Sequence, residues 1–407
     1  MKKKVVIMQS ALFTKRWASQ YCTDELSNSF DLEYWDCSIL TSSTSKCIVL
    51  EREYVYTPSS LEEMKRMLIA LPQDTLIISN IHFLRKNFKL HRLISKFFKH
   101  RIYIDFWSNR PSKIDESRVE MEIPKKKTLK QYLYQVGWIQ VLAKFIRYGG
   151  GERFKTFYSV YRNIRKCEQT IKDEQYCENL YTNHVITCLP HHQYSINHPD
   201  YEKYLQIKDE APIKDKPFIV FVDEYYPYHP DFIEINPEID LEHLAKLYYR
   251  SMNHFFDVIE KQTGMKVIIA AHPMADYSTN PYGGREILIY KTAELIRDSS
   301  YVCMHHGFCL SYVALFDKPM CFISNEAIRG SRYCCENVFV NANMMHMPVV
   351  DSDRIDEYES VFCPLPKDRR ELYINRFFDL SINKRNAELY EQYLNQIHQE
   401  IVKTLKK

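Results

Sequence analysis

Two adjacent histidines and a glycine, His305, His306 and Gly307, stand between the apolar run YVCM and a helix-like run in the second half of the chain. Another histidine, His272, directly follows the apolar run VIIAA. In parallel α/β sheets, ligands bind at the carboxyl ends of strands, where the first amides of the next helix favour phosphate. We therefore predict that these histidines and the amides near Gly307 contact an anionic ligand. Hydrogen-bonded loop histidines are the alternative.

Two consecutive acids, Asp223 and Glu224, follow the apolar run FIVFV. A carboxylate at a strand end can accept the proton of an attacking hydroxyl group. Successive side chains of a strand point to opposite faces, so only one of the two acids can face a ligand. We favour Asp223 as the catalytic base, and a turn role for both acids before Pro227 is the alternative.

Three further charged residues precede the histidine pair in the sequence. Arg285 follows two glycines that permit close backbone approach, and its guanidinium could grip phosphate through two hydrogen bonds. Lys291 is a second candidate for phosphate. Glu294 could accept hydrogen bonds from ribose hydroxyls, or it could stabilise the first turn of a short helix.

The elements that must position these residues alternate along the chain between strand-like and helix-like patterns. Such alternation indicates parallel sheets covered by helices. A polar, proline-marked stretch separates two alternating halves, and the run from Asn386 to Lys403 is amphipathic. The predicted strands are 4–8, 31–36, 75–79, 101–107, 218–224, 265–273, 301–304 and 320–324, and the predicted helices include 61–71, 84–100, 241–263 and 386–403.

Composition excludes several classes of protein. The chain of 407 residues has 45% hydrophobic and 26% charged residues, and it has no apolar run of the roughly 18 residues that a membrane span needs. Its twelve cysteines show no disulfide or zinc spacing, and the acids of Asp351–Asp353 read as a turn. The net charge of +3 argues against general binding of nucleic acid. We expect no metal site. We also expect a cytoplasmic protein, because the first apolar run is too short for a signal peptide.

The stretch from His272 to Ser324, including YGGREILIYKTAELIRDSSYVCMHHGFCLSYVALFDKPMCFIS, resembles the C-terminal, nucleotide-sugar-binding half of GT-B glycosyltransferases. The likeness is to enzymes of bacterial capsule and O-antigen assembly, in which a His-Pro follows one strand and a histidine turn leads into a helix that ends in Lys-Pro. Aligned on Ala314 and Lys318, His306 takes the place of the motif histidine, and Ser311 is the nearest hydroxyl after it. FVDEYYP is similar to the paired-acid motif of GT-B sialyltransferases, with Tyr225 where that motif has glycine.

This resemblance implies an α/β fold of two Rossmann-like domains facing a cleft, with a C-terminal bracing helix. Residues 1–185 would form the acceptor side, 186–380 the nucleotide-sugar donor side, and 381–407 the helix that returns to the first domain. It implies metal-independent transfer of a sugar from a nucleotide sugar to a glycan acceptor, which could be lipid-linked, in surface polysaccharide assembly. A CMP-sugar transferase, a polyol-phosphate transferase, a nucleotide-sugar epimerase and a non-catalytic partner of an assembly complex remain alternatives.

The segment 125–166 combines eleven lysines and arginines with one acid and many aromatic residues. Basic amphipathic segments of this kind bind anionic lipid, which would place the protein on the inner face of the plasma membrane. A core helix with a solvated basic face is the alternative.

Overall fold

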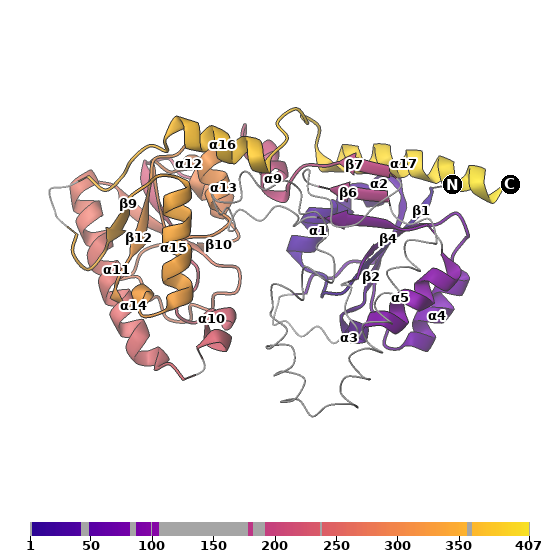
Figure 1. Cartoon of the computed structure of the whole chain (residues 1–407), viewed down its shortest axis with the longest axis horizontal. Helices are drawn as coiled ribbons and strands as arrows, with labels where there is room; N and C mark the ends of the chain where they lie inside the picture. The colour runs from indigo at the N-terminus through magenta and orange to yellow at the C-terminus, as the bar shows by residue number, and fades with distance from the viewer. Residues whose placement is uncertain are drawn as a thin grey trace, which may run out of the picture.

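The computed structural model describes residues 2–41, 49–81, 87–98, 100–105, 178–181, 192–236, 238–355 and 360–406. Within these ranges, none of the helices is both long and apolar enough to cross a membrane. The basic segment 125–166 lies outside them, so its membrane association stays a prediction. Figure 1 shows two α/β bodies side by side, the second one coloured pink to orange.

The first domain is built on a parallel sheet with the strand order β3-β2-β1-β4-β5-β6-β7. Two of its inner strands, KVVIMQ and LIISN, are buried at all but one of their residues, as expected where helices cover both faces of a parallel sheet. The strands are β1 (Lys4–Gln9), β2 (Asp31–Asp36), β3 (Val55–Tyr56), β4 (Leu76–Asn80), β5 (Ile102–Asp105), β6 (Glu178–Tyr181) and β7 (His192–Ser195), and the helices are α1 (Lys15–Tyr21), α2 (Thr23–Ser29), α3 (Ser38–Thr41), α4 (Leu61–Ala70) and α5 (Phe88–Phe97).

The second domain is built on a parallel sheet with the order β10-β9-β8-β11-β12-β13. All five residues of its central strand β8 are buried. The strands are β8 (Phe218–Val222), β9 (Lys266–Ala271), β10 (Ile287–Ile289), β11 (Tyr301–Met304), β12 (Met320–Ser324) and β13 (Val349–Asp351), and the helices are α9 (Pro199–Ile207), α10 (Pro230–Ile235), α11 (Leu241–Thr263), α12 (Thr292–Asp298), α13 (Leu310–Leu315), α14 (Glu326–Arg329), α15 (Arg332–Met344) and α16 (Lys367–Phe377).

Helix α11 illustrates how the sequence builds this domain. The Asp240 side chain accepts a hydrogen bond from the amide of His243 and so caps the first turn. Its apolar residues recur at helical spacing, and they pack in one buried cluster with strands β8 and β9. The helix ends at Gly264, whose φ of 70° is left-handed.

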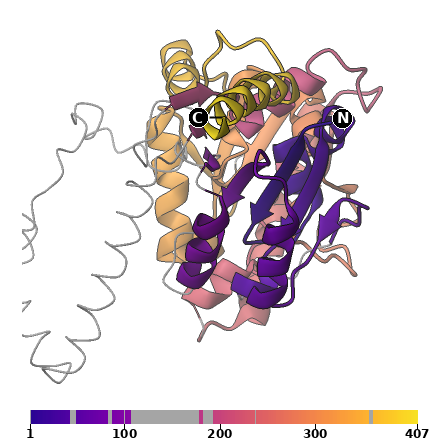
Figure 2. The same ribbon diagram turned by 90° about the vertical axis from the view of Figure 1, so that its right-hand side faces the viewer.

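The chain crosses between the domains twice. The first crossing follows strand β7, which ends at Ser195, beyond the boundary at residue 185 that the sequence suggested. The second follows α16 and leads into α17 (Asn386–Leu405), whose Leu394 and Ile397 share a buried cluster with Ile7 of β1. Figure 2 shows this helix lying along the first domain. The predicted fold class is confirmed in its two parallel-sheet α/β domains and in its C-terminal helix, which packs on the first domain.

Candidate functional site

The second sheet changes direction between strands β8 and β11. From β8 the chain adds β9 and β10 on one side, and then returns to place β11 on the other side of β8. In open α/β sheets, the crevice at the carboxyl ends of two such strands is the usual place for a ligand. Asp223 and Glu224 follow β8 at this point, and His305 and His306 follow β11.

Glu224 and His306 form an ion pair at this switch point. His306 Nε2 lies 2.9 Å from Glu224 Oε2, and the His306 amide donates to Oε1 at 3.0 Å. Burial disfavours the charged imidazole, but the Glu224 charge and hydrogen bonds to Glu224 and Cys334 outweigh it and raise the pKa of His306 to about 10. Burial likewise disfavours the carboxylate, but the charge of His306 outweighs it and leaves the pKa of Glu224 below its usual value. At neutral pH the pair is therefore carboxylate and imidazolium.

Both members of this pair remain partly open to solvent. The side chain of Glu224 is 22% exposed and that of His306 is 18% exposed. Gly307 makes the arrangement possible, because its φ of 115° suits glycine and a Cβ atom there would lie 3.3 Å from Glu224 Oε1. The carboxylate of Glu224 and the imidazole of His306 thus meet beside Gly307, whose lack of a side chain leaves room for them.

His305 has a different environment, although it is next to His306 in the sequence. It is buried, with Nδ1 2.8 Å from the Ile323 carbonyl oxygen and Nε2 2.8 Å from the Tyr248 hydroxyl. Because a carbonyl can only accept, Nδ1 carries the proton and Nε2 accepts from Tyr248. Burial lowers the pKa of His305 and keeps it neutral. The geometry gives His305 a structural role, not the predicted ligand contact.

Asp223 is also enclosed, and four groups donate to it. The Tyr277 hydroxyl donates to Oδ2 at 2.5 Å and the Tyr282 hydroxyl donates to Oδ1 at 2.9 Å. The amides of Tyr225 and His272 complete the set at 2.9 and 3.4 Å. Burial raises the pKa of Asp223 and these hydrogen bonds offset part of that effect. Asp223 joins the loop after β8 to the loop between β9 and β10. Glu224 is the more accessible of the two acids.

His272 lies at the same edge, at the end of β9. Its Nδ1 accepts a hydrogen bond from the amide of Met274 at 3.2 Å, which leaves the proton of a neutral ring on Nε2. The ring meets that of His229 edge to face, with 4.9 Å between centroids. His272 is half-buried. The hydrogen bond from its backbone amide to Asp223 ties it to the residue next to Glu224.

Two predicted ligand residues are used elsewhere. The guanidinium of Arg285 pairs with Asp257 at 2.6 Å and Glu260 at 3.2 Å on helix α11, and it stacks on Phe256. Arg285 therefore holds its loop against α11. Ser311 is fully buried inside α13, where its hydroxyl lies 3.1 Å from that of Tyr373.

Lys291 and Glu294 lie at the start of α12, which follows the carboxyl end of β10. The Glu294 side chain is only 6% exposed, and its Oε1 accepts from Lys203 at 3.0 Å and from Lys291 at 3.5 Å. Its Oε2 is buried and has no hydrogen-bond partner among the described residues. Such an oxygen is costly in a folded protein unless a donor reaches it. A ligand hydroxyl would supply that donor.

No sequence pattern identifies Lys203, Tyr277 or Tyr282 as site residues. Each reaches its partner over 54 to 91 positions in the chain, so no local pattern marks it. Of the acids at 351–353, Asp351 and Asp353 both pair with Arg329. Across the described ranges, no group of three or more histidine, cysteine or acidic residues could hold a metal ion.

No protein-family model matches the sequence, and no curated protein matches it. Among solved structures, a variant of the wall teichoic acid polymerase TagF covers 100% of this chain and 90% of its own, at 10% identity and a TM-score of 0.47. The alignment with the spinosyn forosaminyltransferase SpnP covers 100% of this chain and 99% of SpnP, at 10% identity and a TM-score of 0.36. The alignment with the UDP-N-acetylglucosamine 2-epimerase from Rickettsia bellii covers 98% of this chain and 99% of the epimerase, at 8% identity and a TM-score of 0.40. Each likeness concerns the arrangement of the chain alone.

Proposed function

We propose that the protein is a glycosyltransferase that moves a sugar from a nucleotide sugar to a glycan acceptor. The observation that carries this proposal is the partly exposed Glu224–His306 ion pair at the switch point between β8 and β11. A protonated imidazole at this place favours a bound phosphate, and the carboxylate beside it can accept a proton.

The two groups divide the chemistry between them. As the acceptor hydroxyl attacks the anomeric carbon, its proton passes to the Glu224 carboxylate. The bond from that carbon to the phosphate oxygen breaks, and its electron pair stays on the oxygen beside the His306 imidazolium. We place His272 at the edge of the same site. Because His306 supplies positive charge, this transfer needs no metal ion.

Glu294 and Lys291 form the nucleoside side of the proposed site. The Oε2 atom of Glu294, which has no hydrogen-bond partner in the described part of the chain, is suited to accept from a ribose hydroxyl. Lys291 is half-exposed at the first turn of α12, where its ammonium can reach a phosphate group. These two residues follow β10, and the ion pair follows β8 and β11 at the same edge of the sheet, with β9 between β10 and β8. We place one nucleotide sugar along this edge.

We further propose that the acceptor is a lipid-linked glycan of surface polysaccharide assembly and that the protein works on the inner face of the plasma membrane. The support is the resemblance of residues 272–324 to capsule and O-antigen enzymes and the basic, aromatic composition of 125–166. Sedimentation with vesicles tests the membrane part. Vesicles with anionic lipid should capture the protein and neutral vesicles should not, and capture should fall at high salt.

The first experiment is thermal unfolding of the protein with CMP, UDP, GDP, ADP and TDP, each with magnesium and with EDTA. A ligand at about 100 times its dissociation constant adds roughly 2.7 kcal/mol to the free energy of unfolding. We expect one nucleotide to stabilise the protein with or without magnesium. The same nucleotide linked to its sugar then serves as donor in a transfer assay with membrane extract.

Two variants make this experiment specific. His306→Ala should lose the nucleotide effect, while Glu224→Gln should keep nucleotide binding and lose turnover. His243→Ala is the matched control, because His243 is exposed on helix α11. Failure of every nucleotide to shift the transition, or full turnover by Glu224→Gln, would overturn the proposal.

A further inference from the structure

Lys203 is the cation closest to the buried carboxylate of Glu294. Its Nζ lies 3.0 Å from Glu294 Oε1, whereas Lys291, the other cation at this carboxylate, lies 3.5 Å away. The Lys203 side chain is 31% exposed, but that of Lys291 is 51% exposed. The pair with Lys203 is therefore the shorter and better shielded of the two, and less weakened by water and salt.

Lys203 belongs to helix α9, the first element after the chain enters the second domain. The preceding residue on this helix, Glu202, is buried and accepts from the Arg385 guanidinium and from the Asn386 amide. Asn197 ties the two crossings together, because its amide donates to Asn386 Oδ1 at 2.8 Å. Helix α9 is thus fixed at the point where the chain passes between the domains.

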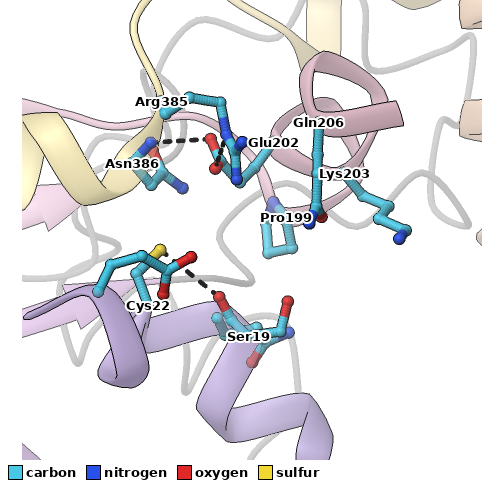
Figure 3. Close-up of a pocket in the computed structure, with 10 residues that line it drawn as sticks. Ser19, Cys22, Pro199, Glu202, Lys203, Gln206, Arg385 and Asn386 are labelled. Carbon is cyan, nitrogen blue, oxygen red and sulfur yellow. Dashed lines mark hydrogen bonds and ion pairs between the residues drawn. The ribbon is translucent and has the colours of Figure 1, made fainter. Parts of the chain in front are cut away.

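Figure 3 shows the two side chains leaving α9 in different directions, Glu202 toward Arg385 and Asn386, and Lys203 away from them. Both line a pocket of about 440 Å³, including space open to solvent, between α9 and the end of helix α1. One turn of α9 therefore contacts the crossing on one side and the candidate nucleoside residue on the other.

We infer that Lys203 is a positioning residue of the donor site, which holds the Glu294 carboxylate in place from the domain crossing. This inference rests on the proposed function, in which Glu294 accepts from the nucleotide. A carboxylate with one oxygen fixed by an ammonium group keeps the other oxygen aimed at a ligand hydroxyl. Without Lys203, Glu294 would hold only the more exposed Lys291.

The charge of Glu294 depends on the same contact. Burial alone would favour the protonated acid. The hydrogen bond from Lys203 opposes it most, followed by the backbone amide of Glu294 and the charges of Lys203 and Lys291, and together they keep the pKa of Glu294 below its usual value. Arg297 on its own helix and Tyr312 on α13 also sense this carboxylate. Loss of Lys203 would raise the pKa of Glu294, so a nucleotide that needs the carboxylate would bind less well as the pH falls.

The test measures nucleotide affinity by calorimetry between pH 5.5 and pH 8, with the nucleotide of the CMP, UDP, GDP, ADP and TDP set that stabilises the wild type. Lys203→Met should weaken binding about tenfold at neutral pH, the loss expected for one charge-assisted hydrogen bond. The loss should grow toward pH 5.5. Lys203→Arg should bind within about threefold of the wild type, because it keeps the charge.

Two further variants separate positioning from general damage to the fold. Lys246→Met, which removes an exposed lysine paired with Glu242 on α11, should bind nucleotide normally. In a Glu294→Gln background, Lys203→Met should have no further effect and no pH dependence, since it acts through Glu294.

The outcomes distinguish this inference from the proposed function. Equal affinity of the wild type and Lys203→Met at every pH would overturn the inference and leave the proposed function standing. An additive loss in the double variant would also overturn it. If the wild type binds none of the five nucleotides, the proposed function fails and this inference fails with it.

Discussion

Strands β1 and β4 of the first sheet stand in the same relation as β8 and β11 of the second, because each sheet reverses direction between them. In the first sheet the two strands end in amides, Gln9 and Asn80. Gln9 donates to the Tyr21 hydroxyl at 3.0 Å, and Asn80 bonds the backbone of Ile104 in both directions. In the second sheet the corresponding ends bear the partly exposed ion pair.

The difference shows that one topology can place buried amides or a partly exposed ion pair, here called the charged edge, at the ends of its two central strands. The amides of the first edge are buried and satisfied by the protein, so they have little left to offer a charged ligand. The first 136 residues also contain no glycine, so a glycine turn like that of Gly307 is absent before residue 137. The charged edge is the one suited to hold a phosphate, because it carries the His306 imidazolium.

The largest effect should come from the buried aspartates behind each edge. Asp223→Ala leaves two tyrosine hydroxyls and two amides without an acceptor, and should lower the free energy of unfolding by about 3 kcal/mol. Asp36 at the end of β2 accepts from only two amides, so Asp36→Ala should cost about 1 to 2 kcal/mol. Hydrogen exchange at increasing urea concentrations measures the free energy of unfolding of each domain separately. Equal losses of stability in Asp223→Ala and Asp36→Ala would contradict the comparison.

Gly307→Ala tests whether the charged edge depends on a bare turn. The left-handed φ and the 3.3 Å approach to Glu224 should together cost about 1 to 2 kcal/mol and weaken nucleotide binding. Gly264→Ala is the control, because its φ is also positive but a Cβ there has nothing within 4 Å. It should lose about 1 kcal/mol of stability and keep nucleotide affinity. Normal nucleotide binding by Gly307→Ala would show that Glu224 tolerates displacement.

The sequence predicted the elements of the fold well because local patterns determine them. The run FIVFV became a buried central strand, and the apolar spacing from Leu241 to Thr263 became helix α11 with the same ends. The run YVCM before the two histidines also became a strand, β11, with the predicted ends. Each of these features depends on residues close together in the chain.

The roles within each adjacent pair could not be read in the same way. Alternation predicts that Asp223 and Glu224 face opposite sides, but it does not say which side is open. That choice comes from distant tyrosines, Tyr277 and Tyr282, which enclose Asp223. Arg285 likewise pairs with helix α11, about 25 residues earlier, although its glycines suggested a phosphate loop.

A double-mutant cycle on Glu224→Gln and His306→Gln measures the coupling within the ion pair. We expect about 1 kcal/mol at pH 7, since the pair is close but partly solvated. His306 has a pKa raised from 6.5 to about 10, so its contribution to stability is complete below about pH 6.5 and is lost as the pH rises through 10. Unfolding measured from pH 6 to 10 should therefore show the coupling fall. A coupling that stays constant over this range would mean that His306 does not lose its proton between pH 6 and pH 10.

The smallest effect should come from Tyr248→Phe, which removes the hydroxyl that donates to His305 Nε2. One buried acceptor would lose its donor, and the protein should lose about 1 kcal/mol of stability. Nucleotide affinity should not change, because His305 makes both of its ring contacts inside the protein. A loss of affinity as large as that of His306→Ala would mean that both histidines serve the ligand. Unchanged affinity would show that His305 supports the fold, while its neighbour His306 is the histidine on which the charged edge depends.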